Sequence, residues 1–197
     1  MIRLSSLITA LLLSLSLALS ACAPAIMGVG TAAVAASSTE KGFSTSVSDG
    51  VITTKLADKF LRTDVDLTQG VSISVNEGAV LLTGIVSTQD KKITATKLSW
   101  EIKGVREVVN EITVKEQTSI KSRAKDFAAA AQLRLKIIGD GGVSSLNYSI
   151  DVVDGVVYIS GVAETEEERA RVIALAQELP FAKKVVDYTI LSSDRRD

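Results

Sequence analysis

The last 150 or so residues of this chain contain two copies of one sequence repeat. A shift of 77 positions, made without a gap, places apolar residues on apolar residues and glycines on glycines. The matched pairs include Leu56 and Leu133, Ile73 and Ile150, Gly78 and Gly155, Val80 and Val157, Gly84 and Gly161, and Val108 and Val185. An internal duplication of this kind predicts two copies of one fold in tandem.

The composition agrees with two small domains rather than one large core. The chain has 197 residues, of which 46% are hydrophobic and only 4% are aromatic. The 22 Lys and Arg residues balance 23 Asp and Glu residues, so the chain has no global basic field and is not expected to bind nucleic acid. A charged partner would have to be recognised by a local patch.

The residue inventory excludes the common catalytic constellations. The chain contains no histidine and one cysteine, which excludes Ser-His-Asp and Cys-His catalysis and leaves too few ligands for a usual zinc site. Paired carboxylates occur at Asp64 and Asp66 and in the run Glu164, Glu166, Glu167 and Glu168. We interpret both groups as solvated turns or helix starts, where acids are favoured by the helix dipole. We therefore expect no enzyme activity, no metal site and no cofactor.

The N-terminus has the layout of an export signal. Residues 1–21 contain Arg3, an apolar stretch from Leu7 to Leu19 and small residues before Cys22, which predicts a signal peptide rather than a membrane span. The four residues from Leu19 to Cys22 resemble a lipobox, the site that bacterial lipoprotein signal peptidases recognise. The resemblance implies that Cys22 carries a diacylglycerol thioether and an amide-linked acyl chain. Several acyl chains would make membrane attachment effectively permanent.

Residue Ala23 is not the aspartate that retains many such lipoproteins at the inner membrane, so resemblance implies a place on the periplasmic face of the outer membrane. Residues 22–47 are rich in Ala, Gly, Ser and Thr and predict a flexible tether after the lipidated cysteine. The apolar part of this segment, residues 26–36, could instead lie against the lipid or pack on a domain.

The apolar pattern predicts the same elements in each repeat. In the first repeat, Ile52, Leu56 and Phe60 recur every four residues and predict a helix that ends near Thr63. Residues 71–75 and 80–84 alternate in polarity around a turn at Gly78 and predict a hairpin. A helix before Gly104 and a strand over 108–114 complete the order α-β-β-α-β. The second repeat has the same pattern, with Pro180 ending its second helix.

Two such units, each with two helices on one face of a three-stranded sheet, form an α+β sandwich. The strand ends around Gly84 and Gly161 and the closing segments 104–110 and 182–187 resemble tandem BON domains. With the lipobox, the chain resembles the dual-BON outer-membrane lipoproteins of the DolP type. The expected organisation is a signal peptide (1–21), a lipidated tether (22–47), a first BON domain (48–116), a second (117–192) and a tail (193–197). The resemblance implies phospholipid binding, a role in envelope integrity and no catalytic residues.

Gly84 and Gly161 are expected to have a structural role, since each would lie between a strand and the start of a helix and permit a tight reversal or close packing.

The two repeats differ most in their first helices. Residues 121–138 have a net charge of +4 from Lys121, Arg123, Lys125, Arg134 and Lys136 against Asp126, whereas residues 44–61 have none. At about 100° per residue, Ala129, Leu133 and Ile137 form the core stripe of this helix. A separate, largely apolar face is formed by Phe127, Ala131, Leu135 and Ile138, where the first repeat has Gly50, Thr54, Asp58 and Leu61. An apolar face beside cations is typical of a helix that binds an anionic membrane.

Three alternatives stay open. The first repeat or the tether could cover Phe127 and Leu135. Trp100, whose counterpart is Gln177, is expected to fill a gap between helix and sheet or between domains, with a membrane or partner anchor as the alternative. The glycine-rich segment 139–142 is expected to be a flexible helix exit rather than a phosphate loop.

Two functions are therefore compatible with the sequence. In the first, the second repeat binds anionic phospholipid at the membrane that holds the anchor. In the second, the anchored protein is a scaffold that engages an envelope protein through a groove between the repeats or an exposed strand.

Overall fold

The computed structural model describes residues 43–116 and 119–194, and both repeats lie within one compact unit of the chain. The expected signal peptide, Cys22 and most of the expected tether lie outside the described residues. Helix α3 spans Phe43–Thr63, so helical structure begins before the expected domain boundary at residue 48. Among the described residues, none of the helices combines the length and the apolar character needed to cross a bilayer.

The first repeat follows the expected order of elements with one addition. After α3 come α4 (Val65–Gly70), β1 (Val71–Asn76), β2 (Ala79–Val86), α5 (Gln89–Trp100), β3 (Glu107–Asn110) and β4 (Thr113–Val114). The short α4 is absent from the expected order of elements, although a turn or helix start was expected at Asp64 and Asp66. It forms because the Asp64 side chain accepts a hydrogen bond from the backbone N–H of Asp66 (2.8 Å) and so caps a helical turn.

The last strand of the first repeat is interrupted, which the sequence pattern did not indicate. Asn110 Oδ1 accepts a hydrogen bond from the backbone N–H of Ile112 (3.0 Å), so the chain makes a local turn between β3 and β4. Ile112 is buried as a result. Both short strands still pair with β2.

The second repeat has the same order of elements but closes with one continuous strand, β7, in place of the two short strands β3 and β4. Its elements are α6 (Ile120–Gly139), the 3₁₀ turn η2 (Ser145–Asn147), β5 (Tyr148–Val153), β6 (Val156–Ala163), α7 (Glu166–Gln177), β7 (Lys184–Leu191) and the 3₁₀ turn η3 (Ser192–Asp194). Helix α7 ends ahead of Pro180, as expected of a residue that cannot donate a backbone hydrogen bond.

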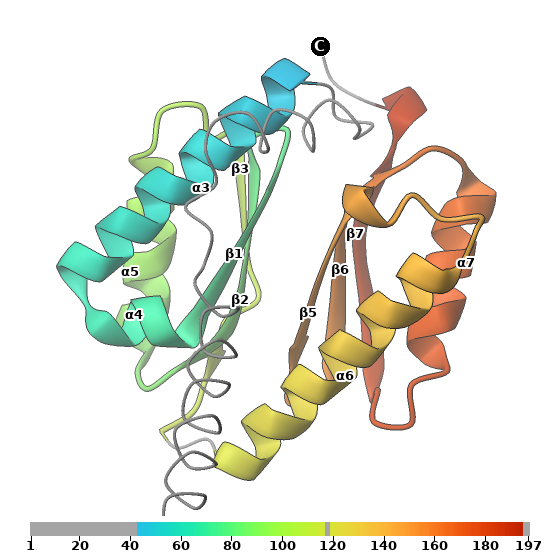
Figure 1. The fold of residues 1–197 in the computed structure, drawn as a ribbon. Helices are drawn as coiled ribbons and strands as arrows, with labels where there is room; N and C mark the ends of the chain where they lie inside the picture. Colours follow the sequence, from blue (N-terminus) through green and yellow to red (C-terminus); the bar gives the residue numbers. More distant parts are fainter. Residues whose placement is uncertain (1–42, 117–118, 195–197) are drawn as a thin grey trace, which may run out of the picture. The chain divides into compact units, whose positions relative to one another are not determined.

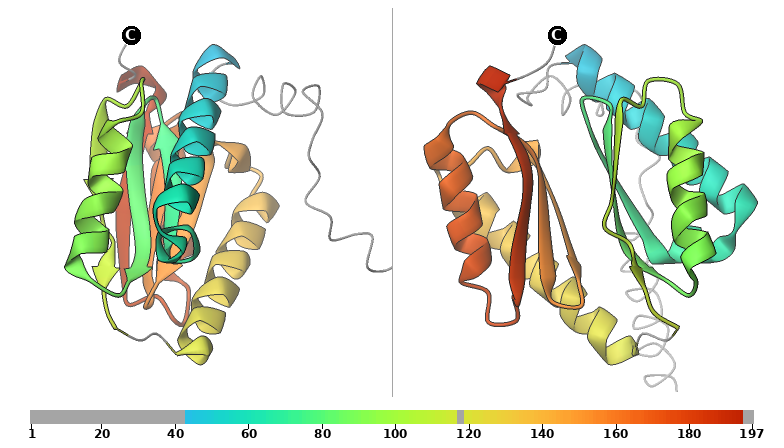
Figure 2. Two further views of the ribbon diagram at one scale, coloured as in Figure 1. Left: turned by 90° about the vertical axis from the view of Figure 1, so that its left-hand side faces the viewer. Right: turned by 180° about the vertical axis from the view of Figure 1, so that it is seen from behind.

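The two sheets have the same topology. In each, the first two strands are antiparallel and the third runs parallel to the second, in the orders β1-β2-β3 and β5-β6-β7. Helices α3 to α5 cover one face of the first sheet, and α6 and α7 cover one face of the second (Figures 1 and 2). The expected α+β sandwiches are thereby confirmed, and each has one sheet face that its own helices leave uncovered.

The hydrophobic cores confirm the 77-residue offset in three dimensions. The first core contains Leu56, Phe60, Val80, Leu82 and Ala95. The second contains their counterparts Leu133, Ile137, Val157, Ile159 and Val172 among its buried residues. Because burial of each large side chain contributes roughly 1.5–3 kcal/mol, these matched positions provide the main stabilisation of each repeat.

A carboxylate near the start of each first helix holds the hairpin turn. Asp49 on α3 accepts hydrogen bonds from the backbone N–H groups of Glu77 (2.9 Å) and Gly78 (3.0 Å). Both turn residues have positive φ, 52° and 77°, which directs their N–H groups to one side. Asp126 on α6 makes the same pair of contacts with the turn at residues 154–155 (2.8 and 3.0 Å). The duplicated contact was not expected from sequence.

The two repeated glycines lie inside strands, not between a strand and a helix as expected. Gly84 is in β2 with φ of 118° and Gly161 is in β6 with φ of 145°. A Cβ atom at Gly84 would lie 2.1 Å from the carbonyl oxygen of Gly70, and one at Gly161 would lie 2.0 Å from that of Asn147. The chain entering the neighbouring strand therefore approaches too closely for any side chain.

The expectation that all acids at the start of α7 are solvated is wrong for Glu168. Its side chain is buried and accepts hydrogen bonds from the backbone N–H groups of Ser144 (2.7 Å) and Glu164 (2.7 Å). Glu166 and Glu167 are exposed. Glu168 thus joins α7 to the segment that precedes β5, because its carboxylate satisfies buried backbone donors.

The glycine geometry predicts large effects from small substitutions. Gly84→Ala and Gly161→Ala should each lower the free energy of unfolding by at least about 2 kcal/mol, because the added methyl group meets a backbone oxygen at a strained φ. Gly50→Ala is the matched control: it lies on α3 with open space around it and should raise stability by about 0.5–1 kcal/mol. Urea unfolding followed by circular dichroism measures all three, and wild-type stability of Gly84→Ala would contradict this account.

Candidate functional site

Helix α6 carries the surface that the sequence singled out. Its N-terminus is capped by Ser119, whose side chain accepts a hydrogen bond from the backbone N–H of Ser122 (3.1 Å). The expected core stripe of Ala129, Leu133 and Ile137 is buried against β5 and α7. The rotation of the helix about its axis is therefore fixed by these residues, and the opposite face is turned outward.

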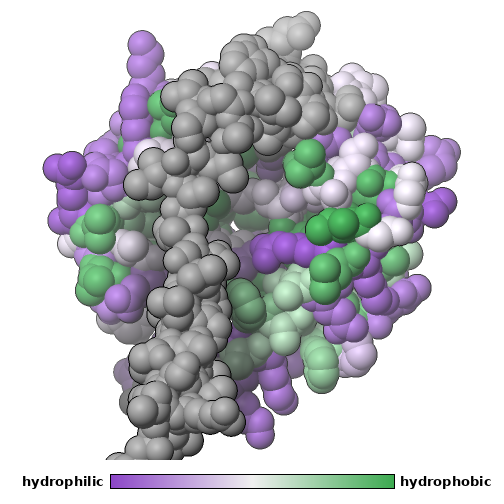
Figure 3. Space-filling model, viewed as in Figure 1, coloured by the Kyte–Doolittle hydropathy of each residue, from purple (hydrophilic) through white to green (hydrophobic). Residues whose placement is uncertain are grey.

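The additional apolar face of α6 is exposed. Phe127, Leu135 and Ile138 are 74%, 70% and 67% exposed, and Ala131 is partly buried. The first repeat therefore does not cover these three side chains, which removes one of the alternatives left open by the sequence. Figure 3, in the same view as Figure 1, shows apolar side chains interspersed with hydrophilic ones along the course of α6. Large exposed apolar side chains that gather on one helix are typical of an interaction surface.

The basic residues of α6 fall into two groups. Lys121, Arg123 and Lys125 are exposed and form no ion pair with another described residue. Arg134 donates from Nη2 to the carbonyl oxygen of Ile150 (2.6 Å), and Lys136 pairs with Glu178 (2.7 Å). The positive charge available for a partner is thus concentrated in the N-terminal half of the helix. Cations are disfavoured there by the helix dipole, so helix stability does not explain them.

A groove lies beside Phe127 at the basic end of α6. It has a volume of about 440 Å³, and its lining includes Arg123 and Arg134 from α6 together with residues of β2. Two acids also line it, but both are engaged elsewhere. Asp126 accepts from the turn at residues 154–155, and Asp151 accepts from a hydroxyl of the first repeat. The groove therefore combines guanidinium groups with an exposed aromatic side chain.

Two exposed apolar residues of the second repeat were missed. Leu146, in η2, is 64% exposed and Phe181 is 54% exposed, and their counterparts in the first repeat are Gln69 and Gly104. The turn η2 contacts α6. The same comparison of the two repeats that identified Phe127 could have found both residues, since each is a position where only the second copy has a large apolar side chain.

The uncovered sheet faces are joined by side-chain hydrogen bonds. The bonds link Ser74 with Ser160 (2.8 Å), the Thr83 hydroxyl with Asp151, and the Tyr188 hydroxyl with Glu111 (2.6 Å). Replacing each residue by its counterpart 77 positions away turns the pair Ser74 and Ser160 into Asp151 and Thr83, which is the second pair. The same replacement turns Glu111 and Tyr188 into each other. Strand contacts follow the same rule, because β1 meets β6 and β2 meets β5. The two repeats are thus related at this interface by a pseudo-two-fold axis.

The tyrosines of this interface have perturbed acidity. Burial raises the pKa of Tyr188 above its ordinary value, and the hydrogen bond to Glu111 raises it further. Burial and the charge of Glu111 also raise the pKa of Tyr158, whose hydroxyl lies 3.5 Å from that carboxylate. Both side chains therefore stay neutral well into the alkaline range.

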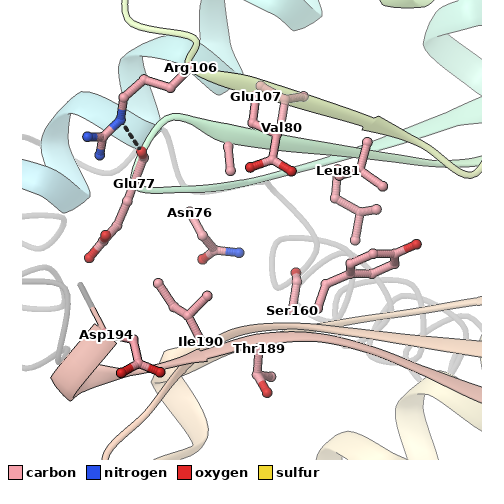
Figure 4. Close-up of a pocket in the computed structure, with 13 residues that line it drawn as sticks. Asn76, Glu77, Val80, Leu81, Arg106, Glu107, Ser160, Thr189, Ile190 and Asp194 are labelled. Carbon is pink, nitrogen blue, oxygen red and sulfur yellow. Dashed lines mark hydrogen bonds between the residues drawn. The ribbon is translucent and has the colours of Figure 1, made fainter. Parts of the chain in front are cut away.

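One end of the interface contains a cavity of about 410 Å³. Figure 4 shows the side chain of Asn76 directed between the two sheets, with Leu81 and Ile190 on opposite sides of the space. Asn76 was expected only as part of the hairpin turn. Its counterpart is Val153, and this exchange of polar for apolar was the signal that could have found it.

Trp100 fills neither a gap between helix and sheet nor one between the domains, so that expectation is wrong. It is 54% exposed near the end of α5, on the same helix as Ile93, which is 42% exposed. Ser99 is buried and faces the core, so the rotation of α5 about its axis directs the next residue, Trp100, toward solvent.

The glycine-rich exit of α6 forms a turn in which Asp140 Oδ1 accepts a hydrogen bond from the backbone N–H of Gly142 (2.9 Å).

Comparison with known proteins agrees with the duplicated architecture. The sequence profile of the BON domain matches residues 48–116 and 125–191. A protein of Anaplasma centrale, described as an uncharacterized protein in the gshII 5' region, is 38% identical over 126 residues, which cover 64% of this chain and 83% of the relative.

Two further relatives are named. The outer membrane lipoprotein DolP of Haemophilus influenzae is 28% identical over 178 residues, covering 90% of this chain and 92% of DolP. The osmotically-inducible protein Y of Escherichia coli is 26% identical over 139 residues, covering 70% of this chain and 69% of that protein.

The raised pKa of Tyr188 predicts how the molecule responds to alkali. In the unfolded chain the tyrosine hydroxyls lose their protons near pH 10, whereas Tyr188 in the folded protein keeps its proton to higher pH. The free energy of unfolding is therefore unaffected by Tyr188 below about pH 10 and falls as the pH rises above it. Tyr188→Phe should make this fall shallower, and Tyr158→Phe should do so less. Urea midpoints between pH 8 and about pH 12 test this. Identical pH profiles for wild type and Tyr188→Phe would contradict it.

Proposed function

The chain belongs to the BON domain family, and on this premise we propose that it is a non-enzymatic envelope lipoprotein that binds anionic phospholipid through its second BON domain and supports outer-membrane integrity. The relation to DolP, named as an outer membrane lipoprotein, supports the cellular place. The lipobox that ends at Cys22 supports an acyl anchor, and Cys22 lies outside the described residues. The periplasmic face of the outer membrane is the proposed location.

The exposure of Phe127 and Leu135 is the observation that carries the proposal. Both side chains are more than two-thirds exposed on a helix whose rotation is fixed by its buried stripe. A protein anchored to a bilayer by acyl chains would hold this face close to lipid, so partial insertion of the two side chains removes apolar area from water. Full burial of such a side chain contributes roughly 1.5–3 kcal/mol, and insertion to the depth of the headgroups a part of that.

The cations of α6 supply the preference for anionic lipid. Lys121, Arg123 and Lys125 are exposed, and each cation near an anionic surface contributes on the order of 1 kcal/mol. Arg123 and Arg134 line the groove beside Phe127, where a lipid phosphate could accept charge-assisted hydrogen bonds while the ring enters the acyl boundary. Arg134 would keep its contact with Ile150 and offer its remaining donors.

Vesicle sedimentation tests this proposal with protein that begins at Ala23 and so carries no acyl chain. We expect binding to vesicles that contain phosphatidylglycerol, weak binding to pure phosphatidylcholine, and a loss of binding as salt rises. Phe127→Glu should lower the partition coefficient by at least about tenfold, because it removes the inserted ring and adds a charge that anionic lipid repels. Leu135→Glu should act in the same direction.

Leu61→Glu is the matched control. Leu61 is 60% exposed on α3, at the position that corresponds to Ile138, and residues 44–61 of that helix have a net charge of zero, against +4 for residues 121–138. This variant should bind like the wild type. Equal sedimentation with neutral and anionic vesicles, or unchanged binding of Phe127→Glu, would overturn the proposed lipid surface.

A second function, as a scaffold for an envelope protein, is favoured by the exposed face of α5. Ile93 and Trp100 are seven positions apart, which places them on the same side of that helix. Their counterparts in the second repeat are Ala170 and Gln177, so only the first repeat has this apolar pair. Exposed tryptophan is enriched where proteins bind one another.

Site-specific crosslinking in the envelope separates the two functions. A photoreactive residue at position 100 should capture one defined protein if the first repeat is the scaffold, and Ile93→Asp should abolish that adduct. A photoreactive residue at position 127 should instead capture lipid. A protein adduct at position 127 with no lipid adduct there would favour the scaffold over the lipid-binding function.

A further inference from the structure

The interface between the repeats is symmetric in its hydrogen bonds, but the side chains that fill its two ends differ in size. At one end the inward positions are occupied by Tyr158 and Val156, and at the other by their smaller counterparts Leu81 and Ala79. The cavity of about 410 Å³ lies at the end with the smaller side chains. Pockets of this volume are typical of small-ligand sites. The space exists because the two copies have diverged, not because the fold requires it.

Asn76 makes this cavity more than a packing defect. Its side chain lines the cavity and the residue is only 9% exposed. Its Oδ1 atom has no hydrogen-bond partner among the described residues. An unsatisfied buried acceptor costs free energy, and the second repeat avoids the cost with Val153 at the same position. The first repeat thus retains a polar group that its own packing does not use.

The remainder of the lining indicates what could satisfy that acceptor. Leu81, Val109 and Ile190 offer apolar surface inside the cavity. The charged lining residues in the described part of the chain are Arg106 and three acids, namely Glu77, Glu107 and Asp194. Arg106 donates from Nε to the backbone oxygen of Glu77 (2.8 Å), as Figure 4 shows. Among the described lining residues, the exposed carboxylates of Glu107 and Asp194 therefore lie beside an acceptor and an apolar wall.

We propose that this cavity between the two BON domains is a second binding site, specific for a small amphipathic ligand that carries a primary ammonium group on an apolar body. The ammonium group is favoured by the carboxylates of Glu107 and Asp194. It donates a hydrogen bond to Asn76 Oδ1, which is closed to solvent in the free protein and turns toward the cavity by rotation of the side-chain amide. The apolar body packs on Leu81 and Ile190. Arg106, Glu107 and Asp194 are exposed, so the mouth of the cavity opens to solvent between them. The site is distinct from the α6 surface and does not depend on lipid binding there.

Methyl NMR of the full lipidated chain in phosphatidylcholine nanodiscs tests this site, with n-butylammonium as the probe. We expect saturable shifts of the methyl resonances of Leu81, Val109 and Ile190. Butyrate and 1-butanol at the same concentration should give none. Shifts of equal size with 1-butanol would overturn the proposal, because the ammonium group would then contribute nothing.

Two variants replace a cavity residue of the first repeat by the residue found at the corresponding position of the second repeat. Leu81→Tyr should fill the cavity and abolish the shifts. Asn76→Val should weaken butylammonium binding by about tenfold and leave the thermal unfolding temperature unchanged or higher, because it removes an unsatisfied acceptor. A lower unfolding temperature with unchanged binding would show that Asn76 is structural and would overturn the proposal.

Ser72→Ala is the control on the same strand, since Ser72 is exposed and lies outside this cavity. It should bind butylammonium like the wild type. Phe127→Glu should also do so, which separates failure of the ammonium site from failure of the lipid surface on α6. If Leu81→Tyr does not fold, Asn76→Val decides the question alone.

Discussion

Each repeat depends on one carboxylate that ties its first helix to its hairpin. Asp49 and Asp126 each accept two backbone N–H groups from a turn whose two central residues have positive φ. Hydrogen bonds to a charged acceptor are about twice as strong as neutral ones, and Asp49 is buried, so water competes with them poorly. The contact fixes both the hairpin register and the position of the helix on the sheet. The rotation of α6, and with it the outward direction of Phe127, follows from this contact together with the buried stripe that begins at Ala129.

The pairing of the two sheets decides which surfaces remain for partners. Because each repeat turns its uncovered sheet face toward the other, the polar side chains on those faces find partners across the interface, as Ser74 does with Ser160. The helices are left on the outside, where the sister repeat cannot cover them. The pseudo-two-fold arrangement also explains why divergence between the copies is informative. A position that differs between them, such as Asn76 and Val153, lies at an equivalent place in the fold and so reports a difference in task or tolerance rather than in fold.

Much of the architecture could be predicted because it is local and repeated. The four-residue spacing of Leu133 and Ile137 and the two-residue spacing along each hairpin are set by helix and strand geometry, so the elements and their core faces followed from the pattern. The errors arose where a distant group decides the outcome. Glu168 looked like a solvated acid, but backbone donors from the segment before β5 bury it. Gly84 looked like a strand end, but the constraint is the carbonyl of Gly70 on the neighbouring chain segment.

The sequence by itself determined that one α-β-β-α-β unit is present twice and that only the second copy has a basic first helix with surplus apolar residues, because those properties are carried by spacing, composition and comparison of the copies. The tertiary structure alone decided that Phe127 and Leu135 stay exposed, that the Trp100 side chain lies on the surface of its domain, and that Asn76 lines a cavity between the repeats. Exposure and cavities depend on how separate elements pack against one another, and that packing is set by contacts between residues far apart in the chain.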